Sequence, residues 1–215
     1  MGMARSAGLS MDLSAAMSRH KGRRLYFLRH GQTQFNVEGR LQGQCDEPLN
    51  ARGRDQATAI GGWLGAHRAI DMARLSFWSS PLVRAAETME RARVAMGLPA
   101  DGYHRDARLM EISFGEWEGL TWPEIEARDA QGVYAREADK WGYTPPGGES
   151  YIAITERVAR WLDDTPGDLF AVGHGGTGRA FYVLLAGMDP EIAVIEPVPQ
   201  GRAALFENGA FRWIG

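Results

Sequence analysis

The sequence predicts an α/β protein with a mostly parallel central sheet. Short apolar segments typical of buried strands alternate with longer segments whose apolar residues recur at helical spacing. Two of the apolar segments, at 25–28 and 169–172, end in a histidine followed by glycine, at His30-Gly31 and His174-Gly175. Ligands of open α/β sheets bind at the carboxyl ends of strands. If these two strands are neighbours, the two histidines face one another there and form one site.

Composition indicates one ordinary globular domain. The 215 residues are 44% hydrophobic and 24% charged, and the net charge of −3 gives no sign of a nucleic-acid or membrane partner. No apolar run approaches the ~20 residues of a membrane span. The one cysteine, Cys45, excludes an internal disulfide and fits a reducing compartment, so we expect a cytoplasmic protein.

The N-terminal segment lacks a sustained apolar block. We expect residues 1–22 to form a flexible, dispensable extension and residues 23–215 to form a single domain. The basic cluster at 19–24 is interpreted as a solvated group of charges that flanks the first strand.

The first half of the chain follows the alternation from that strand onwards. Residues 34–50 are expected to be a loop, and Asn50 caps a helix to about His67. The remaining elements of this half are a strand at 75–78, a helix that begins at Ser80-Pro81 and ends before Gly97, and an edge strand at about 107–112.

The second half contains one irregular insertion. The expected elements are short helices within 121–138, an irregular Pro- and Gly-rich stretch at 141–148, helices at 149–164, 177–187 and 189–195, and a hairpin of 203–206 and 211–214 about Asn208-Gly209. We expect the insertion at about 112–148 to fold over the site as a lid.

Five motifs, in order, carry a resemblance to a known family. They are Leu28-Arg29-His30-Gly31-Gln32-Thr33 with Asn36, Gly39-Arg40-Leu41-Gln42-Gly43, Ser80-Pro81-Leu82-x-Arg84-Ala85-x-x-Thr88, Glu111-Ile112-x-Phe114-Gly115-x-Trp117-Glu118-Gly119, and Gly173-His174-Gly175. The chain resembles the histidine phosphatase superfamily over roughly residues 24–208. This resemblance implies the phosphoglycerate mutase-like fold, a three-layer α/β/α sandwich with about six strands.

The resemblance also implies a role for each motif residue. His30 matches the nucleophile that forms a phosphohistidine, and Glu111 matches the general acid. Arg29, Arg84 and His174, together with Asn36, would hold the phosphoryl oxygens, since a guanidinium binds phosphate through two donors. Gln42 and Gly43 match substrate-contacting positions, and Gly175 and Gly176 offer backbone N–H groups. Nearby Glu116 and Glu118 are rivals of Glu111, and only the motif position favours Glu111.

Other chemistries find less support. No Gly-x-Ser-x-Gly nucleophile elbow occurs, and Arg52 lies one position too far from Cys45 for a cysteine phosphatase. None of the five histidines pairs with another ligand at a recognisable metal spacing. We therefore expect a mechanism without a metal or cofactor.

The resemblance leaves phosphatase and mutase as alternatives. The mutases place Arg and a His-Tyr-Gly-Gly run after the acid, whereas Ile112-Ser113-Phe114-Gly115 follows Glu111 here. We expect four aromatic residues to pack on an apolar or ring-bearing leaving group: Trp117, Trp122, Trp141 and Tyr143. We expect a phosphomonoesterase for small-molecule phosphate esters, resembling the α-ribazole phosphatase branch. A cofactor-dependent phosphoglycerate mutase and a non-catalytic phosphate-binding protein remain as alternatives, and a homodimer is the one protein partner left open.

Overall fold

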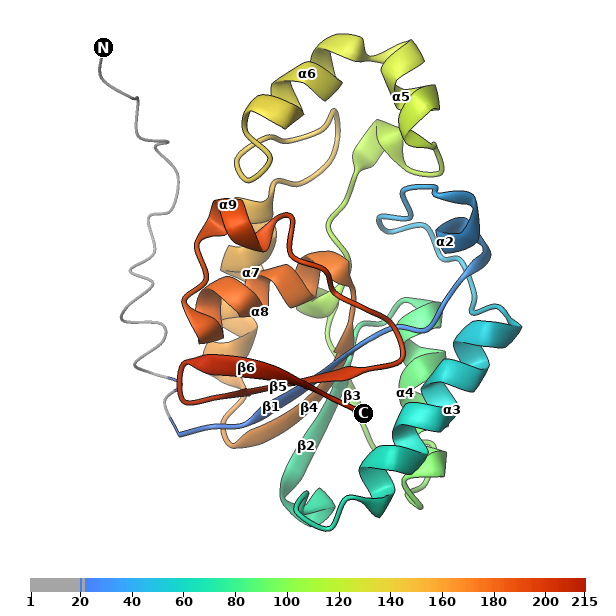
Figure 1. Ribbon diagram of the computed structural model, residues 1–215, viewed down its shortest axis with the longest axis vertical. Helices are drawn as coiled ribbons and strands as arrows, with labels where there is room; N and C mark the ends of the chain where they lie inside the picture. The colour runs from blue at the N-terminus through green and yellow to red at the C-terminus, as the bar shows by residue number, and fades with distance from the viewer. Residues whose placement is uncertain (1–19, 21) are drawn as a thin grey trace.

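The computed structural model describes residue 20 and residues 22–215 (Figure 1). Most of the expected N-terminal extension, apart from His20 and Gly22, therefore lies outside the described residues. Among the described helices, none has the length and apolar character needed to cross a membrane.

Six strands form one sheet, with the order β3-β2-β4-β1-β5-β6. They are β1 (Leu25–Arg29), β2 (Leu75–Ser79), β3 (His104–Arg105), β4 (Asp168–Gly173), β5 (Ala203–Glu207) and β6 (Ala210–Ile214). The first four in this order run parallel, and β5 and β6 are antiparallel. The predicted mostly parallel sheet of about six strands is thus confirmed. The strands β1 and β4 are parallel neighbours with Arg29 opposite Gly173, so both histidines follow paired residues.

Helices cover both faces of the sheet, which gives the predicted three layers (Figure 1). The α-helices are α2 (Gln34–Glu38), α3 (Ala51–Ala66), α4 (Val83–Ala95), α5 (Trp122–Arg128), α6 (Ala130–Ala138), α7 (Tyr151–Asp164), α8 (Gly175–Ala186) and α9 (Pro190–Ala193). Three short 3₁₀ helices lie at η1 (Met72–Arg74), η2 (Ala107–Leu109) and η3 (Gly115–Trp117).

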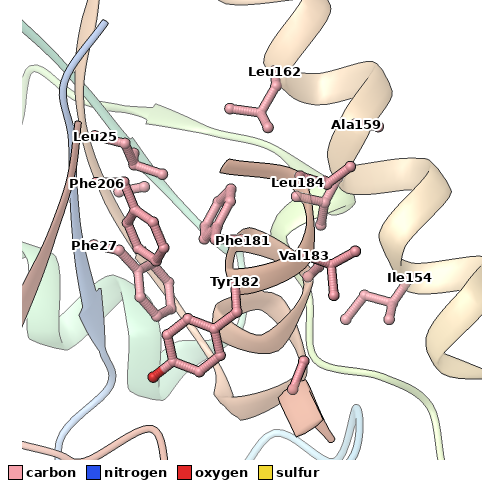
Figure 2. Packing of buried hydrophobic residues seen from close by; sticks show 14 of the residues in the cluster. Leu25, Phe27, Ile154, Ala159, Leu162, Phe181, Tyr182, Val183, Leu184 and Phe206 are labelled. Atoms are coloured by element: carbon pink, nitrogen blue, oxygen red, sulfur yellow. The ribbon is translucent and has the colours of Figure 1, made fainter. Parts of the chain in front are cut away.

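Alternation along the central strands divides the core in two. Leu25 and Phe27 of β1 point to one face, where Figure 2 shows Phe181 and Phe206 packed around them, with α7 beyond. Tyr26 and Leu28 point to the other face, against α3 and α4. Because successive side chains of a strand point to opposite faces, an entirely apolar strand is what a sheet covered on both sides requires.

Local signals explain several boundaries. The side chain of Asn50 accepts a hydrogen bond from the Gly53 N–H and caps α3 as predicted. Asn208 and Gly209 both have positive φ, at 52° and 79°, which a two-residue type I′ turn between β5 and β6 requires.

Three expected boundaries were wrong. Helix α4 begins at Val83 rather than at Ser80-Pro81, with Leu82 in an extended conformation as its N-cap residue. The edge strand is β3, and 107–109 form η2, where the Asp106 side chain accepts the Arg108 N–H. The expected loop at 34–50 contains α2, which Thr33 and Asn36 begin with a reciprocal capping box.

The insertion at 112–148 is fastened to the loop that follows α2. Figure 1 shows α5 and α6 at one end of the molecule, away from the sheet. Nη1 of Arg40 donates to the Glu124 carboxylate at 2.9 Å and to the Gly119 carbonyl at 2.8 Å. A backbone bridge joins Arg40 to Thr121. These contacts attach the insertion to the loop after α2. Its action as a lid stays a prediction.

Candidate active site

His30 lies at the carboxyl end of β1 with only 1% of its surface exposed. Its backbone N–H donates to the Gly173 carbonyl, and its Nδ1 atom lies 2.7 Å from the Gly31 carbonyl oxygen. Because a carbonyl oxygen only accepts, Nδ1 carries the proton and Nε2 keeps a free lone pair. Burial, reinforced by the charges of Arg84 and Arg29, holds the pKa of His30 well below 6.5. The geometry thus gives a neutral imidazole with one nucleophilic nitrogen.

Gly31 allows this turn to lie directly against the first turn of α3. A methyl group on Gly31 would lie 2.3 Å from the Gly53 carbonyl oxygen, so no larger residue fits. The Gly31 N–H donates to the Thr88 hydroxyl at 3.0 Å, which connects the turn to α4.

His174 faces His30 from the neighbouring strand. The two ring centroids lie 5.1 Å apart, and His174 is the N-cap residue of α8. Its Nε2 lies 2.8 Å from the Ser80 hydroxyl, while its buried Nδ1 has no partner in the described chain. Burial, with Arg84 as the largest nearby charge, also holds the pKa of His174 well below 6.5. Ser80 was expected only as a helix cap, and its place in a family motif beside Arg84 was the signal for a role in the site.

Two guanidinium groups flank the histidines. Arg84, fully buried in the first turn of α4, donates to the Cys45 carbonyl at 2.6 Å and to the Gly43 carbonyl at 2.7 Å. Arg29 donates to the Val198 carbonyl at 2.8 Å. The Nε atoms of both arginines are buried and have no partner among the described residues. Backbone carbonyls therefore fix both cations and leave donors unused, as a binding site for an oxyanion requires.

Glu111 sits on the N-terminus of α8. Its carboxylate accepts hydrogen bonds from the N–H groups of Gly175 at 3.0 Å, Gly176 at 2.8 Å and Ile112 at 3.0 Å. The positive end of the helix dipole attracts a carboxylate to this position. We expected the N–H groups of Gly175 and Gly176 to contact phosphate. In this structure they donate to Glu111 and hold its carboxylate in place.

The remaining predicted residues form a loop network around Thr33. The Asn36 carbonyl oxygen accepts from the Thr33 N–H at 3.1 Å and from the Gln200 amide at 2.9 Å. The Gln42 side chain accepts from the Thr33 hydroxyl at 2.9 Å. Gln44, which sequence reasoning missed, donates from its amide to the Glu111 carbonyl at 3.2 Å. This network joins the loop after β1 to the segment that carries Glu111.

Glu118 and Glu116, the two other candidates for the general acid, have different surroundings from Glu111. Glu118 accepts from the Gln44 and Phe114 N–H groups, both at 3.0 Å, and from the Ser113 hydroxyl at 3.1 Å, so it organises a loop. Glu116 is exposed. Burial and Glu118 raise the pKa of the Cys45 thiol, which makes this cysteine a poor nucleophile.

The expected aromatic contact with the leaving group was wrong for two of its members. Trp117 is 2% exposed, stacks on Tyr143 and donates to Asp129 at 3.1 Å. Trp141 is 8% exposed and stacks on Tyr151. Trp117 therefore packs within the insertion, whereas Trp141 joins the core that α7 and α8 form against the sheet. Within residue 20 and residues 22–215, no three His, Cys, Asp or Glu side chains gather as metal ligands.

Comparison with known proteins agrees with this geometry. The sequence profile of the histidine phosphatase superfamily (branch 1) matches residues 25–203. The chain belongs to this superfamily. It is 38% identical over 178 residues to glucosyl-3-phosphoglycerate phosphatase of Mycobacterium tuberculosis, covering 77% of this chain and 76% of that protein.

Solved histidine phosphatases have the same fold. The crystal structure of a putative α-ribazole-5′-phosphate phosphatase from Escherichia coli superimposes with a TM-score of 0.76 at 26% identity, covering 90% of this chain and 95% of that one. A mycobacterial glucosyl-3-phosphoglycerate phosphatase in complex with VO₃ gives a TM-score of 0.71 at 31% identity, covering 89% and 97% of the two chains. The predicted class, a phosphomonoesterase of this superfamily, is confirmed.

Proposed function

We propose that this histidine phosphatase hydrolyses small-molecule phosphomonoesters through a phosphohistidine on Nε2 of His30. The observation that carries the proposal is the free Nε2 of a buried, neutral His30 that faces His174 between two carbonyl-anchored guanidiniums. A nucleophile, charge-stabilising donors and a proton source are the components that phosphate ester cleavage needs together.

In the first step Nε2 of His30 attacks phosphorus, and the bond from phosphorus to the ester oxygen breaks. Arg29 and Arg84 hold the phosphoryl oxygens as charge spreads over them. We assign the Ser80 hydroxyl as the donor to Nε2 of His174, since its oxygen already accepts the Leu82 N–H. The proton on Nδ1 is then free for a third phosphoryl oxygen. Protonated Glu111 gives its proton to the departing alkoxide, so the product leaves as a neutral alcohol.

Water completes the reaction. Glu111, now a carboxylate, takes a proton from a water molecule as the oxygen attacks phosphorus and the bond to Nε2 breaks. Inorganic phosphate is released, and both His30 and Glu111 return to their starting states. In each step one bond to phosphorus forms and one breaks. The proposed steps use no metal ion and no redox partner.

The relatives indicate which esters to try first. One is a glucosyl-3-phosphoglycerate phosphatase and the other a putative α-ribazole-5′-phosphate phosphatase, so we propose a small organic metabolite as the substrate. The single cysteine, Cys45, fits a reducing compartment, so we propose the cytoplasm as the place of action. The names of the two relatives favour hydrolysis over the mutase reaction. The missing Arg and His-Tyr-Gly-Gly run after Glu111 points the same way.

The test is phosphate release by the purified protein from a panel of phosphomonoesters, with the His30→Ala variant beside it. We expect turnover by the wild type and none by the variant. His67→Ala is the matched control, because His67 is exposed and stacks on Trp63. Interconversion of 3- and 2-phosphoglycerate that outpaces phosphate release would show a mutase instead.

A further inference from the structure

Arg157 of α7 binds the backbone that carries Glu111 and has no place in the proposed mechanism. Nη2 of Arg157 donates to the Glu111 carbonyl at 3.0 Å, and Nη1 donates to the Arg108 carbonyl at 2.7 Å. The Arg157 side chain is 12% exposed, and its helix neighbours Ile154 and Val158 are fully buried in the core. A guanidinium on a rigid helix therefore fixes both ends of the short segment that leads to the expected general acid.

The guanidinium is itself oriented by a carboxylate. Nε and Nη2 of Arg157 both donate to Glu149, each at 3.0 Å, in the bidentate geometry that an arginine and a carboxylate form. Glu149 also accepts the Ser113 N–H at 3.0 Å, and its own N–H donates to the Ser113 carbonyl at 2.8 Å. A lysine could not make all the contacts of Arg157 at once, because it presents a point charge instead of a planar fork.

Glu111 is consequently fixed at both of its ends. Its carbonyl accepts from Arg157 and from the Gln44 amide. Its carboxylate accepts from the N–H groups at the start of α8. The contacts of the carboxylate depend on its charge, because a helix N-terminus attracts a carboxylate more strongly than a neutral carboxyl. The proposed mechanism makes Glu111 neutral in its first step and charged in its second, and the contacts of its carbonyl are the same in both.

We propose that Arg157 is a positioning residue for Glu111, which keeps the carboxyl in place while it is protonated. This inference rests on the proposed function and adds a residue to it. The hydrogen bonds that the structure gives Arg157 include none to His30 or His174. Loss of Arg157 should therefore slow proton transfer to the leaving group and leave the attack of His30 on phosphorus intact.

The dependence of the rate on the leaving group tests this role. For Arg157→Met we expect kcat/KM with alkyl phosphates to fall about 10- to 100-fold, because a small displacement of a catalytic group can cost about 10²-fold. The loss with p-nitrophenyl phosphate should be much smaller, since this leaving group hardly needs a proton. Arg157→Lys keeps a positive charge beside Glu149 but loses the fork, so its loss with alkyl esters should be intermediate. This second variant gives the comparison even if Arg157→Met does not fold.

Two further variants separate positioning from stability. In the Glu111→Gln background, Arg157→Met should add little to the leaving-group dependence, because the group that Arg157 positions no longer carries an acidic proton. Arg108→Met is the matched control. The Arg108 side chain pairs with Asp106 and Asp164 on the same side of the fold, and no hydrogen bond described for it reaches Glu111. Its loss should lower the melting temperature and leave the leaving-group dependence unchanged.

Hydrogen exchange of the Gly175 and Gly176 amides reads the position of Glu111 without turnover. In Arg157→Met both amides should exchange about tenfold faster, because the carboxylate that accepts them is less well fixed. In Arg108→Met they should exchange as in the wild type.

The outcomes keep the positioning role and the proposed function apart. Equal losses with alkyl and aryl esters, an undiminished selective loss in the Glu111→Gln background, or unchanged exchange of the two amides would overturn the role of Arg157 and leave the phosphatase in place. Absence of phosphate release by the wild type from every ester, p-nitrophenyl phosphate included, would overturn the proposed function. The exchange of the two amides would then still decide whether Arg157 positions Glu111.

Discussion

Nδ1 of His30 lies 2.7 Å from the carbonyl oxygen of the next residue, Gly31. The turn after β1 therefore fixes the tautomer of the ring by its own backbone, with no second side chain. Catalytic histidines are more often oriented by a carboxylate. A neutral acceptor holds the ring without adding negative charge to a site that must bind a phosphate dianion.

This contact predicts which nitrogen is phosphorylated. We expect the trapped intermediate to be the Nε2-linked isomer, 3-phosphohistidine, on His30. Quenching with denaturant at alkaline pH and two-dimensional NMR of the labelled peptide distinguish the isomers. Phosphate on Nδ1, or on Cys45, would contradict the assignment. Vanadate, which resembles the transition state, should inhibit the wild type and protect His30 from labelling.

The buried histidines predict a loss of stability in acid. Both pKa values are lowered in the folded protein, so below about pH 6.5 the unfolded chain binds protons that the folded chain does not. Stability is therefore complete above that pH and falls as the pH decreases, by up to about 1.4 kcal/mol per pH unit for each histidine.

Melting temperatures at pH 7.5 and pH 5 measure this effect. His30→Asn keeps a donor for the Gly31 carbonyl and removes one titrating group, so its melting temperature should fall less between the two pH values. The control His67→Ala should match the wild type, because that ring is exposed. An equal fall in His30→Asn would contradict the assigned direction of the His30 pKa.

Removal of the Ser80 hydroxyl should impair His174. The Ser80→Ala variant leaves Nε2 of a buried ring without its partner, and the Leu82 N–H loses its acceptor. We expect a loss of about 1–3 kcal/mol in the free energy of unfolding. We also expect kcat to fall about tenfold, since the tautomer is no longer fixed.

The neighbouring Ser79 provides a matched control. Its buried hydroxyl donates to the Ser80 carbonyl at 2.9 Å and does not touch His174. Ser79→Ala should cost a similar stability and leave kcat close to the wild type. Equal losses of kcat in both variants would show that Ser80 acts through packing alone.

Glu111→Gln should expose the proton-transfer step. A glutamine keeps one acceptor oxygen, which can serve the Gly176 and Ile112 N–H groups but not the Gly175 N–H as well, and it carries no acidic proton. Esters with poor leaving groups should slow by about 10²- to 10⁴-fold, whereas p-nitrophenyl phosphate should slow much less in its first step. Steady-state rates with alkyl and aryl esters give this comparison. Glu118→Gln, in the loop that Glu118 organises, should lower stability without changing the dependence on the leaving group.

Two truncations test the predicted N-terminal extension. A chain that begins at His20 should keep the melting temperature and activity of the full protein. A chain that begins at Arg23 loses His20, whose buried ring bonds to Arg23 at 2.9 Å and lies 3.4 Å from Asp163. We expect this second chain to melt a few degrees lower with unchanged kcat, because Arg23 and Asp163, which His20 contacts, do not belong to the candidate site. A lower kcat in either chain would show that the extension affects the site.

The strands, caps and turns that support the site could be predicted because their sequence signals are local. Apolar runs, the cap at Asn50 and the turn at Asn208-Gly209 each depend on neighbours in the chain. Pairing of β1 with β4 was conditional in the sequence, and the structure supplied it. The motif residues then came together as expected, since both strand ends meet at one edge of the sheet.

The errors arose where a side chain has a distant partner. Ser80 carries a strong helix-cap signal and its hydroxyl does accept the Leu82 N–H, but the same hydroxyl also bonds to His174, which follows β4. Gly175 and Gly176 offer free N–H groups in the sequence, but Glu111 occupies them from 64 and 65 residues away.

The pairing of β1 also determines at which point during synthesis the candidate site can form. The hydrogen-bonded neighbours of β1 are β4 and β5, both from the last quarter of the sequence. During synthesis from the N-terminus, β1 therefore emerges long before either partner, and His30 has no His174 to face until β4 has been made. Such long-range pairing is slow, because the chain loses the entropy of closing a long loop before the stabilising contacts form. A ribosome-bound or prematurely ended chain consequently carries the nucleophile motif without a phosphatase, and catalysis begins only when nearly the whole domain has been released.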